Sequence, residues 1–434
     1  FGGNSPQCDG TFTMGTTSIQ SLKMYLIYLN VGTTTPTSIQ GNIMKNINYR
    51  SSNTEPFYGM FINAGAVNIG TVTGNAIGDT TGTGSLTLTS TAAGALSYGI
   101  NVVSTGDVTI SNNRIGSILA ANSTATNGHS FYAINKSLGA GTFTVNGNTI
   151  GSQSTSGNIQ CSSAATGNNQ YMAGIYANPT ASATFSNNVV ANLLNSTTRN
   201  DAGSYVYGIY ISGTATNVIS RNFIRNLSCN SAGTNNMLAG FYSASSSGTS
   251  TFTNNIISLG GGIDNKLYAI NGIYDNSGST EYYYHNTVYL YGSITGNTSV
   301  NTSAFNKSGL NQGLTLKNNV FVNSRSGGTG SGKHCAINLN NISITSDYND
   351  LYAPNTNGVT GIYNTTIYST LEAWKTATLL DVNSANDNPL LQNAGGNTAI
   401  DYKPTVDLYG TDLSSTVPTD FIGTTRSTDP TMGA

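Results

Sequence analysis

A short phrase built around asparagine returns throughout the chain at nearly constant spacing. It reads TISNNRIGSI at residues 109–118 and recurs as FTVNGNTIGS, TFSNNVVANL, VISRNFIRNL, TFTNNIISLG and TLKNNVFVNS. Successive copies lie 30 to 40 residues apart, measured between the last Asn of each phrase. Internal repeats of this length are typical of solenoids, propellers and arrays. The ten positions are Asn42, Asn75, Asn113, Asn148, Asn188, Asn222, Asn255, Asn286, Asn319 and Asn349.

Apolar and small residues keep step with this Asn. Two residues after it, an apolar side chain stands in all ten copies, from Met44 to Leu351. Three residues before it, the side chain is apolar in nine of ten copies, and Ser346 is the exception. About thirteen residues upstream, a Gly or Ala precedes an apolar residue, as in Gly99 and Ile100. Each repeat is therefore one structural unit with several fixed positions.

The pattern around these positions alternates with a period of two, as in VYGIYIS and GDVTIS, which predicts short strands. Three short strands in about 34 residues, with no helix between them, are typical of one coil of a parallel β-helix. We therefore predict an all-β fold, a right-handed parallel β-helix of about ten coils over residues 1–349. Residues 350–434 are predicted to form a C-terminal cap, because the last coil would otherwise expose open strand edges.

The repeated Asn is interpreted as a corner of the coil. Asn tolerates the left-handed backbone conformation that a sharp corner needs. Stacked Asn side chains also hydrogen-bond to the coils above and below. The sequence thus predicts a structural ladder, not a ligand site, at Asn75, Asn113, Asn148, Asn188, Asn222, Asn255, Asn286 and Asn319.

Tyrosine placement suggests a binding surface. If Ile175 and Ile209 point into the coil, the residue after each points outward. This reasoning places a stripe of Tyr176, Tyr210, Tyr242 and Tyr274 on the outside, and a second patch of Tyr282, Tyr284, Tyr289 and Tyr291. Aromatic faces suit stacking on sugar rings, and the neighbouring column of Gly174, Gly208, Gly240 and Gly272 predicts a shallow groove. The alternative is that the rings stack on one another and stabilise the sheet beneath loops.

The remaining part of each repeat varies in length and is polar, as in LAANSTATNGHS, QSTSGNIQCSSAATGNNQ, NSTTRNDAGS and SCNSAGTNNM. Insertions in a solenoid collect at one corner. We expect a side decorated with loops, which serves either as binding surface or as solvated padding.

Catalysis is weakly supported. Glycoside hydrolysis needs a carboxylate pair, and pectate-type elimination needs carboxylates around Ca²⁺. Only 18 acids are spread over 434 residues, and the repeat columns do not stack them. His129, His285 and His334 lie in separate repeats; His285, with Glu281 nearby, is the one considered as a base, although corner packing is favoured. An enzyme stays open, and loops would have to assemble its acids.

Composition limits the partners. Only 8% of residues are charged, the net charge is −2, and no basic run attracts nucleic acid or anionic lipid. No apolar stretch is long enough to span a bilayer. No cofactor is expected; a structural Ca²⁺ in a loop lacks a repeated Asp-rich motif. Cys8, Cys161, Cys229 and Cys335 lie far apart, so free thiols and a disulfide are both open.

The C-terminal region carries a resemblance. Its strings SDYNDLYAP, YSTLEAWKTAT, NPLL and FIGTTRSTDPTMGA resemble the closing region of secreted right-handed parallel β-helix proteins of Bacteroidota, many of them cell-surface or adhesin-like. The resemblance implies secretion by the type IX pathway. Within YSTLEAWKTATLL, Ser369 or Thr370 is expected to cap a short helix that carries Leu371, Trp374 and Leu379.

These observations predict a secreted, cell-surface structural or adhesive module that binds glycans or other surface proteins without catalysis. A polysaccharide lyase or glycoside hydrolase of the same fold is the alternative. Ice binding ranks last, because Thr-rich strings do not recur in one column. The chain starts at FGGNSPQCDG without Met or a signal peptide, so we expect part of a longer polypeptide or surface assembly.

Overall fold

Parallel strands stacked coil upon coil make up most of the chain. The computed structural model describes residues 1–434 except 16–17, 125, 165–166, 199–202, 232, 310–312 and 341–342. It is 49% strand and 3% helix, a β-solenoid of about ten turns, which confirms the predicted parallel β-helix. The chain divides into two compact units: the first comprises Phe1–Thr184, Asn188–Gly213 and Asn226–Leu238, and the second Phe185–Asn187, Thr214–Arg225 and Ala239–Ala434.

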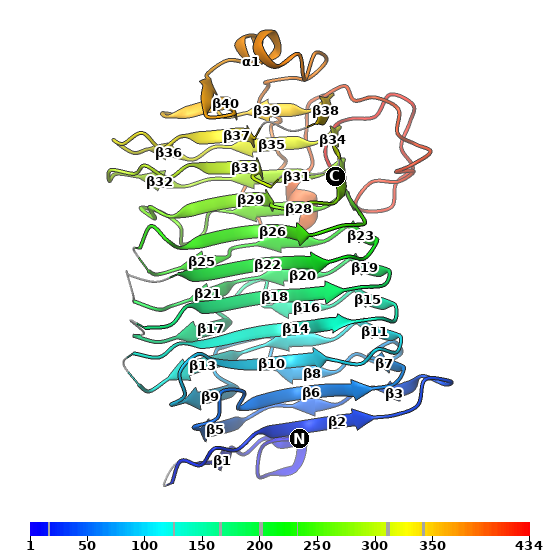
Figure 1. The fold of residues 1–434 in the computed structure, drawn as a ribbon, viewed down its shortest axis with the longest axis vertical. Helices are drawn as coiled ribbons and strands as arrows, with labels where there is room; N and C mark the ends of the chain where they lie inside the picture. Colours follow the sequence, from blue (N-terminus) through cyan, green and yellow to red (C-terminus); the bar gives the residue numbers. More distant parts are fainter. Residues whose placement is uncertain are drawn as a thin grey trace. The chain divides into compact units, whose positions relative to one another are not determined.

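The first unit contributes one strand per coil to each of four parallel sheets (Figure 1). A sheet of short strands contains β1 (Phe12–Met14), β5 (Ile47–Ser51), β9 (Leu86–Ser90), β13 (Ile118–Asn122), β17 (Ile159–Ser162), β21 (Leu193–Asn195) and β25 (Ser228–Cys229). The long-strand sheet contains β2 (Met24–Asn30), β6 (Phe57–Ala64), β10 (Ala95–Val102), β14 (His129–Gly139), β18 (Gln170–Pro179) and β22 (Ser204–Gly213). Before the Asn corner lie β3 (Thr37–Ile39), β7 (Val67–Ile69), β11 (Val108–Ser111), β15 (Phe143–Asn146) and β19 (Ala183–Ser186); after it lie β4 (Ile43–Met44), β8 (Ala76–Gly78), β12 (Arg114–Gly116), β16 (Thr149–Gly151) and β20 (Val189–Ala191). A 3-10 turn, η1 (Pro6–Cys8), precedes them.

The second unit repeats this plan with shorter long strands. Its long-strand sheet contains β26 (Met237–Ser245), β29 (Ala269–Asp275), β33 (Thr302–Lys307), β37 (His334–Leu339), β40 (Gly358–Tyr363) and the antiparallel β41 (Thr366–Tyr368). Before the corner lie β23 (Asn217–Ser220), β27 (Thr249–Thr253), β30 (Thr280–Tyr284), β34 (Gly313–Lys317) and β38 (Ile344–Asp347). After the corner, the post-corner sheet contains β24 (Phe223–Arg225), β28 (Ile256–Leu259), β31 (Thr287–Leu290), β35 (Val320–Asn323) and β39 (Asp350–Tyr352). β32 (Ser293–Ile294) pairs with β36 (Ser326–Gly327).

The core consists of equivalent residues stacked in register. In the first unit, Ile100 pairs with Ile134, Ile134 with Ile175 and Ile175 with Ile209, and all four side chains are fully buried. In the second unit, residues two after the corner Asn form another buried column, in which Ile257 pairs with Val288. Parallel pairing with side chains buried toward the inside of the coil explains why these positions are uniformly apolar.

The corner Asn residues form the predicted ladder within each unit. In the first unit, Nδ2 of Asn42, Asn75, Asn113 and Asn148 donates to Oδ1 of the next Asn at 2.8–3.0 Å, ending at Asn188. In the second, Asn222, Asn255, Asn286 and Asn319 do the same at 2.9–3.0 Å, ending at Asn349. The same Oδ1 also accepts the backbone N–H of the preceding ladder Asn, for example Asn75 N to Asn113 Oδ1 at 3.0 Å. The ladder therefore satisfies both side chains and corner backbone.

The left-handed residue of the corner was placed wrongly by the sequence argument. The ladder Asn residues do not have positive φ. In nine of the ten corners the residue immediately before them has φ between 53° and 67°, as in Gly41, Asn112 and Asn318. At some corners the preceding residue is large, such as Arg221, His285 or Tyr348. The ladder Asn is needed for its amide, and the turn itself is made one residue earlier.

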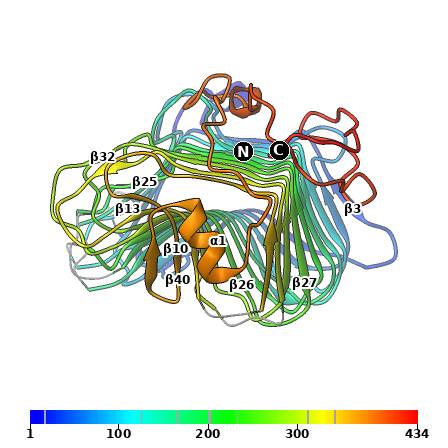
Figure 2. The ribbon, with the colours of Figure 1, turned by 90° about the horizontal axis from the view of Figure 1, so that it is seen from above.

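The C-terminal segment, residues 369–434, begins by covering the last coil. Helix α1 (Leu371–Thr378) lies over the end of the stack of coils (Figure 2). Its N-cap is Thr370, whose side chain accepts from Ala373 N, which confirms the predicted cap. Trp374 is fully buried, and a Cβ on Gly361 would lie 2.5 Å from its ring. Trp374 Nε1 donates to Asp381 Oδ2 at 2.8 Å, while Asp381 Oδ1 accepts from Asn349 Nδ2. The cap thus closes the ladder as well as the core.

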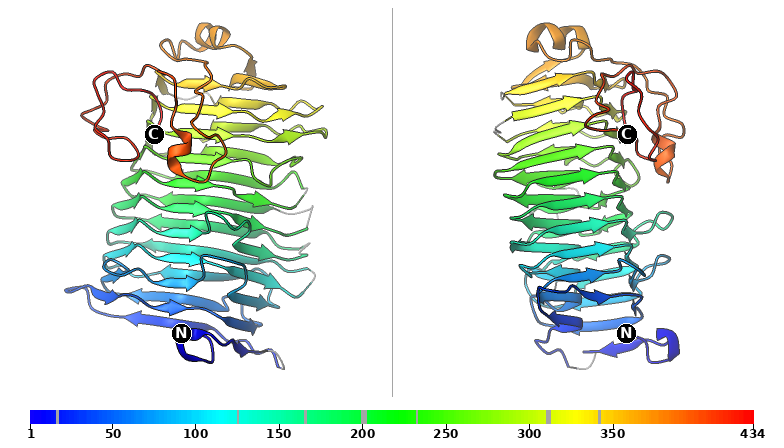
Figure 3. Two further views of the ribbon diagram at one scale, coloured as in Figure 1. Left: turned by 180° about the vertical axis from the view of Figure 1, so that it is seen from behind. Right: turned by 90° about the vertical axis from the view of Figure 1, so that its right-hand side faces the viewer.

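The rest of the segment lies along the outer face of the second unit (Figure 3). Leu408 and Met432 pack on Val320 and Val322 of β35 in one buried cluster. Polar contacts fix the chain to the corners below, where Asn318 Nδ2 donates to Thr411 O at 2.7 Å. Arg426 Nη2 likewise donates to Asn254 Oδ1 at 2.7 Å. The 3-10 turn η2 (Ala399–Tyr402) belongs to this covering segment.

Candidate functional sites

The tyrosines of the first unit stack on one another. Tyr132 and Tyr176 have ring centroids 4.5 Å apart at 2°, and Tyr176 and Tyr210 are 4.2 Å apart at 5°. Tyr176 and Tyr210 face outward and are half-buried, as expected. Burial, followed by the neighbouring Tyr176 phenol, raises the pKa of Tyr210 well above its usual value. Because Tyr176 lies between Tyr132 and Tyr210, both faces of its ring are covered by neighbouring rings.

The second unit carries the other tyrosines that the sequence singled out. Tyr242 and Tyr274 are half-buried and meet edge to face, with centroids 4.8 Å apart at 63°. Tyr282 and Tyr284 are also half-buried on the outer side of β30, with centroids 5.8 Å apart. Burial and the neighbouring Tyr282 raise the pKa of Tyr284 to about 12. The ring contacts support the alternative in which these residues stabilise the sheet by same-face packing.

The groove expected beside the Tyr stripe is absent, because the glycines face the core. A Cβ on Gly174 would lie 2.5 Å from Cγ1 of Val190, and one on Gly240 would lie 2.5 Å from Cγ2 of Ile257. One on Gly272 would lie 2.2 Å from Cγ1 of Val288. The small residue is thus required where the long strand approaches the post-corner sheet, and it leaves no hollow on the outside.

The three histidines are buried and hydrogen-bonded. Burial lowers the pKa of His129 to about 4 and that of His334 to about 4. The pKa of His285 falls to about 3, because of burial first and of the nearby Arg426 charge second. Both ring nitrogens of His285 have partners, since Asn318 Nδ2 lies 3.0 Å from Nε2 and Gly433 O lies 3.2 Å from Nδ1. These contacts support corner packing for His285.

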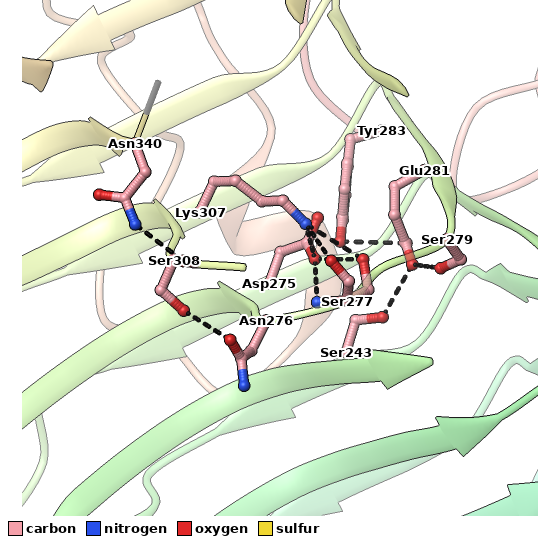
Figure 4. A network of polar contacts seen from close by, with 10 residues as sticks. All are labelled: Ser243, Asp275, Asn276, Ser277, Ser279, Glu281, Tyr283, Lys307, Ser308 and Asn340. Atoms are coloured by element: carbon pink, nitrogen blue, oxygen red, sulfur yellow. Dashed lines mark hydrogen bonds and ion pairs between the residues drawn. The ribbon is translucent and has the colours of Figure 1, made fainter. Parts of the chain in front are cut away.

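Two acids and a lysine meet inside the second unit, where the sequence showed no cluster (Figure 4). Lys307 from β33 forms an ion pair with Asp275 at the end of β29, at 2.7 Å, and both side chains are 0% exposed. Lys307 Nζ also donates to Ser277 O and Ser277 Oγ at 2.9 and 3.1 Å. The second oxygen of Asp275, Oδ2, has no hydrogen-bond partner among the described residues.

Glu281 from β30 is the third charged member of this network. Its Oε1 accepts from Ser279 Oγ at 2.6 Å and from Ser243 Oγ at 3.0 Å. Burial, followed by the negative charge of Asp275, raises the pKa of Glu281 to about 8, so the carboxyl is largely protonated at neutral pH. The network therefore holds one ion pair and one neutral acid. Its full burial separates it from any substrate.

Sequence reasoning missed this network because Asp275 and Lys307 are 32 residues apart in the chain, and Glu281 lies on a different strand. The available indication was the unusual charge at strand ends, Asp275 and Lys307, at equivalent positions of successive coils. Register confirms that pairing, since Asp275 is directly opposite Lys307.

The structure also bears on the cysteines, on metal ligands, on membrane spans and on the polar insertions. None of the four cysteines is part of a disulfide. Within the described residues, no three His, Cys, Asp or Glu side chains gather to hold a metal, and no helix there is long and apolar enough to cross a membrane. The polar insertions that were expected to decorate one corner fall partly outside the described residues, at 125, 165–166, 199–202 and 232.

Comparison of the chain with protein-family models, with curated proteins and with solved structures gave no match.

Proposed function

We propose that the chain is a structural or adhesive β-helix module of a cell surface that binds glycans without cleaving them. The observation that carries this proposal is the location of the clustered acids. Asp275 and Glu281 are fully buried, together with Lys307. A hydrolase or lyase needs such groups beside its substrate, whereas a binding module needs only surface aromatic and polar groups.

Outward tyrosines supply those groups on both units. Tyr176 and Tyr210 lie half-buried on the outside of the coil, and phenol groups there suit contact with sugar rings and hydroxyls. Glycans or other surface proteins are the proposed partners. Secretion, and an origin among Bacteroidota with type IX export, belong to the same proposal and rest on the resemblance of the C-terminal strings.

A glycan-array screen run beside an assay for new chain ends tests the proposal. The proteins are the wild type, a Tyr176→Ala/Tyr210→Ala double variant and a Tyr409→Ala control, which alters a tyrosine that is 74% exposed. We expect binding by the wild type and the control, without new reducing or unsaturated ends. Release of such ends would overturn the proposal in favour of a lyase or hydrolase, and binding to no glycan would remove the adhesive function.

A further inference from the structure

A cleft of about 440 Å³ lies on the outer face of the second unit. Its floor is formed by the post-corner sheet, through Tyr289, Val322 and Tyr352, and its wall by Pro389, Leu390 and Leu391 of the C-terminal segment. This volume is within the range of roughly 300–1,000 Å³ that is typical of small-molecule sites.

Two tyrosines from neighbouring coils line the floor of the cleft. Tyr289 pairs with Val322, and Val322 with Tyr352, so the two tyrosines flank a smaller side chain in one outward column. Tyr289 stacks on Tyr291, with centroids 5.2 Å apart. Tyr352 is half-buried and makes no ring contact with any described residue. Tyr352 packs against the buried cluster that contains Val322 and lines the cleft, so part of its side chain borders the space that a ligand would occupy.

Polar groups at the rim have unused hydrogen-bonding capacity. Asn388 Oδ1 accepts from Leu390 N at 3.0 Å, while its Nδ2 has no partner in the described part of the chain. Asn355 Nδ2 donates to Ser324 O at 2.7 Å, which leaves Asn355 Oδ1 as an acceptor without a described donor. Both residues line the cleft. One amide donor and one acceptor thus stand beside an aromatic face.

The wall of the cleft is built in advance. Leu391 pairs with Pro404 in an antiparallel bridge, Gln392 N donates to Lys403 O at 3.0 Å, and Thr405 N donates to Pro389 O at 3.2 Å. Because these bonds form within the covering segment itself, the wall needs no ligand to become ordered. A preformed site binds with a smaller entropic cost.

Charge selects the ligand class. None of the described residues that line this cleft is charged. By contrast, a smaller cavity of about 240 Å³ elsewhere on the same segment is lined by Lys403, Arg426, Asp420 and Asp429. An anionic sugar entering the uncharged cleft would lose hydration without gaining a cation.

From these contacts we infer that the cleft between β31, β35, β39 and residues 388–394 binds an uncharged sugar unit of a glycan, stacked on Tyr352 and hydrogen-bonded by Asn388 and Asn355. This inference deepens the proposed glycan-binding function and rests on it, since it assigns that function a further site, besides the outward Tyr176 and Tyr210, and a ligand class.

The test is isothermal titration of the whole chain with neutral hexasaccharides of β-1,4-linked glucose, mannose and xylose, and with hexagalacturonate as the acidic probe. We expect the wild type to bind at least one neutral probe and not the acidic one. Tyr352→Ala and Asn388→Ala are expected to weaken that binding at least about tenfold. Tyr352→Phe, which keeps the ring, and Tyr409→Ala are expected to leave it unchanged.

The outcomes distinguish a failure of the cleft assignment from a failure of the proposed glycan-binding function. If a neutral probe binds with equal affinity to the wild type, Tyr352→Ala and Asn388→Ala, the cleft assignment is overturned while the proposed function stands. If hexagalacturonate is the probe that binds, the ligand class is wrong. If no probe binds to the wild type and the glycan array is also negative, the proposed function fails together with the cleft. Melting temperatures of all variants establish that each is folded.

Discussion

The Asn ladder and the Asp275–Glu281–Lys307 network both bury polar side chains, but they satisfy them differently. The ladder is neutral and repeated, so each amide finds its partner in the neighbouring coil. The network is not repeated from coil to coil in the described part of the chain. It contains an ion pair at 0% exposure and leaves Asp275 Oδ2 without a hydrogen-bond partner there. Burying a neutral amide with partners costs little, whereas a buried charge depends on one specific counter-ion. This difference predicts how strongly substitutions in the two regions lower the free energy of unfolding.

Removal of the lysine has the largest expected effect. Lys307→Met leaves Asp275 buried and unpaired, and we expect the free energy of unfolding to fall by about 3–5 kcal/mol. Urea unfolding followed by circular dichroism measures the loss. The matched control is Lys23→Met, which removes an ion pair with Glu55 whose side chains are 37% and 40% exposed; its expected effect is below about 1 kcal/mol. Equal losses in the two variants would show that burial adds nothing to the ion pair.

A substitution in the middle of the ladder comes next. Asn113→Ala removes the acceptor of Asn75 N and Asn75 Nδ2, and the donor to Ile69 O. Two buried backbone groups then lose their partners, and we expect a loss of about 2–3 kcal/mol. The same urea titration measures it. A loss below that of the Lys23→Met control would mean that water or rearranged backbone replaces the amide.

The stability that Glu281 costs per pH unit is expected to be smaller than the loss caused by Asn113→Ala. Its pKa of about 8 in the folded chain exceeds the ordinary 4.5, so its stabilising contribution is complete below about 4.5 and is lost as the pH rises toward 8. Relative to Glu281→Gln, a neutral isostere, the wild type should lose about 1 kcal/mol of stability per pH unit across that window. Melting temperatures of both proteins from pH 4.5 to 8 measure the difference. If the melting temperatures of the two proteins change in parallel with pH, Glu281 does not have the raised pKa.

The first rung of the ladder has the smallest expected effect. Asn42 is half-buried, and its Oδ1 accepts no hydrogen bond from the described residues. Asn42→Ala is therefore expected to cost less than about 1 kcal/mol. A loss as large as that of Asn113→Ala would show that the terminal coil is as tightly coupled as the interior ones.

The sequence predicted those features that recur in every coil. The period located the ladder Asn, and strand alternation identified Ile175 and Ile209 as inward residues, because equivalent positions meet in register. Thr370 was recognised from local capping chemistry. Features that depend on non-equivalent residues were not predictable in this way. The contact of Gly174 with Val190 crosses the coil, and the path of residues 386–434 is fixed by side-chain contacts such as Arg426 with Asn254.

The candidate sites also contain some residues that the repeat pattern predicted and others that it did not. Tyr289 was expected on the outside from alternation, and it faces the cleft. Tyr352 and Asn388 escaped notice because the cleft exists only where the covering segment meets the sheet. The Asp275 and Lys307 pair escaped because charges at strand ends are usually solvated, and only the register of the two strands shows that these face each other.

The direction of the ladder bears on the order in which coils mature during synthesis. Within each unit the backbone N–H of a corner Asn donates toward the following coil, as Asn319 does to Asn349. A coil that has just left the ribosome therefore holds unsatisfied donors until its successor is made, and each new coil consolidates the one before it. The last donor, Asn349 N, is received by Ser384 Oγ at 2.8 Å. Consolidation of the second unit thus waits for residues translated after its final corner.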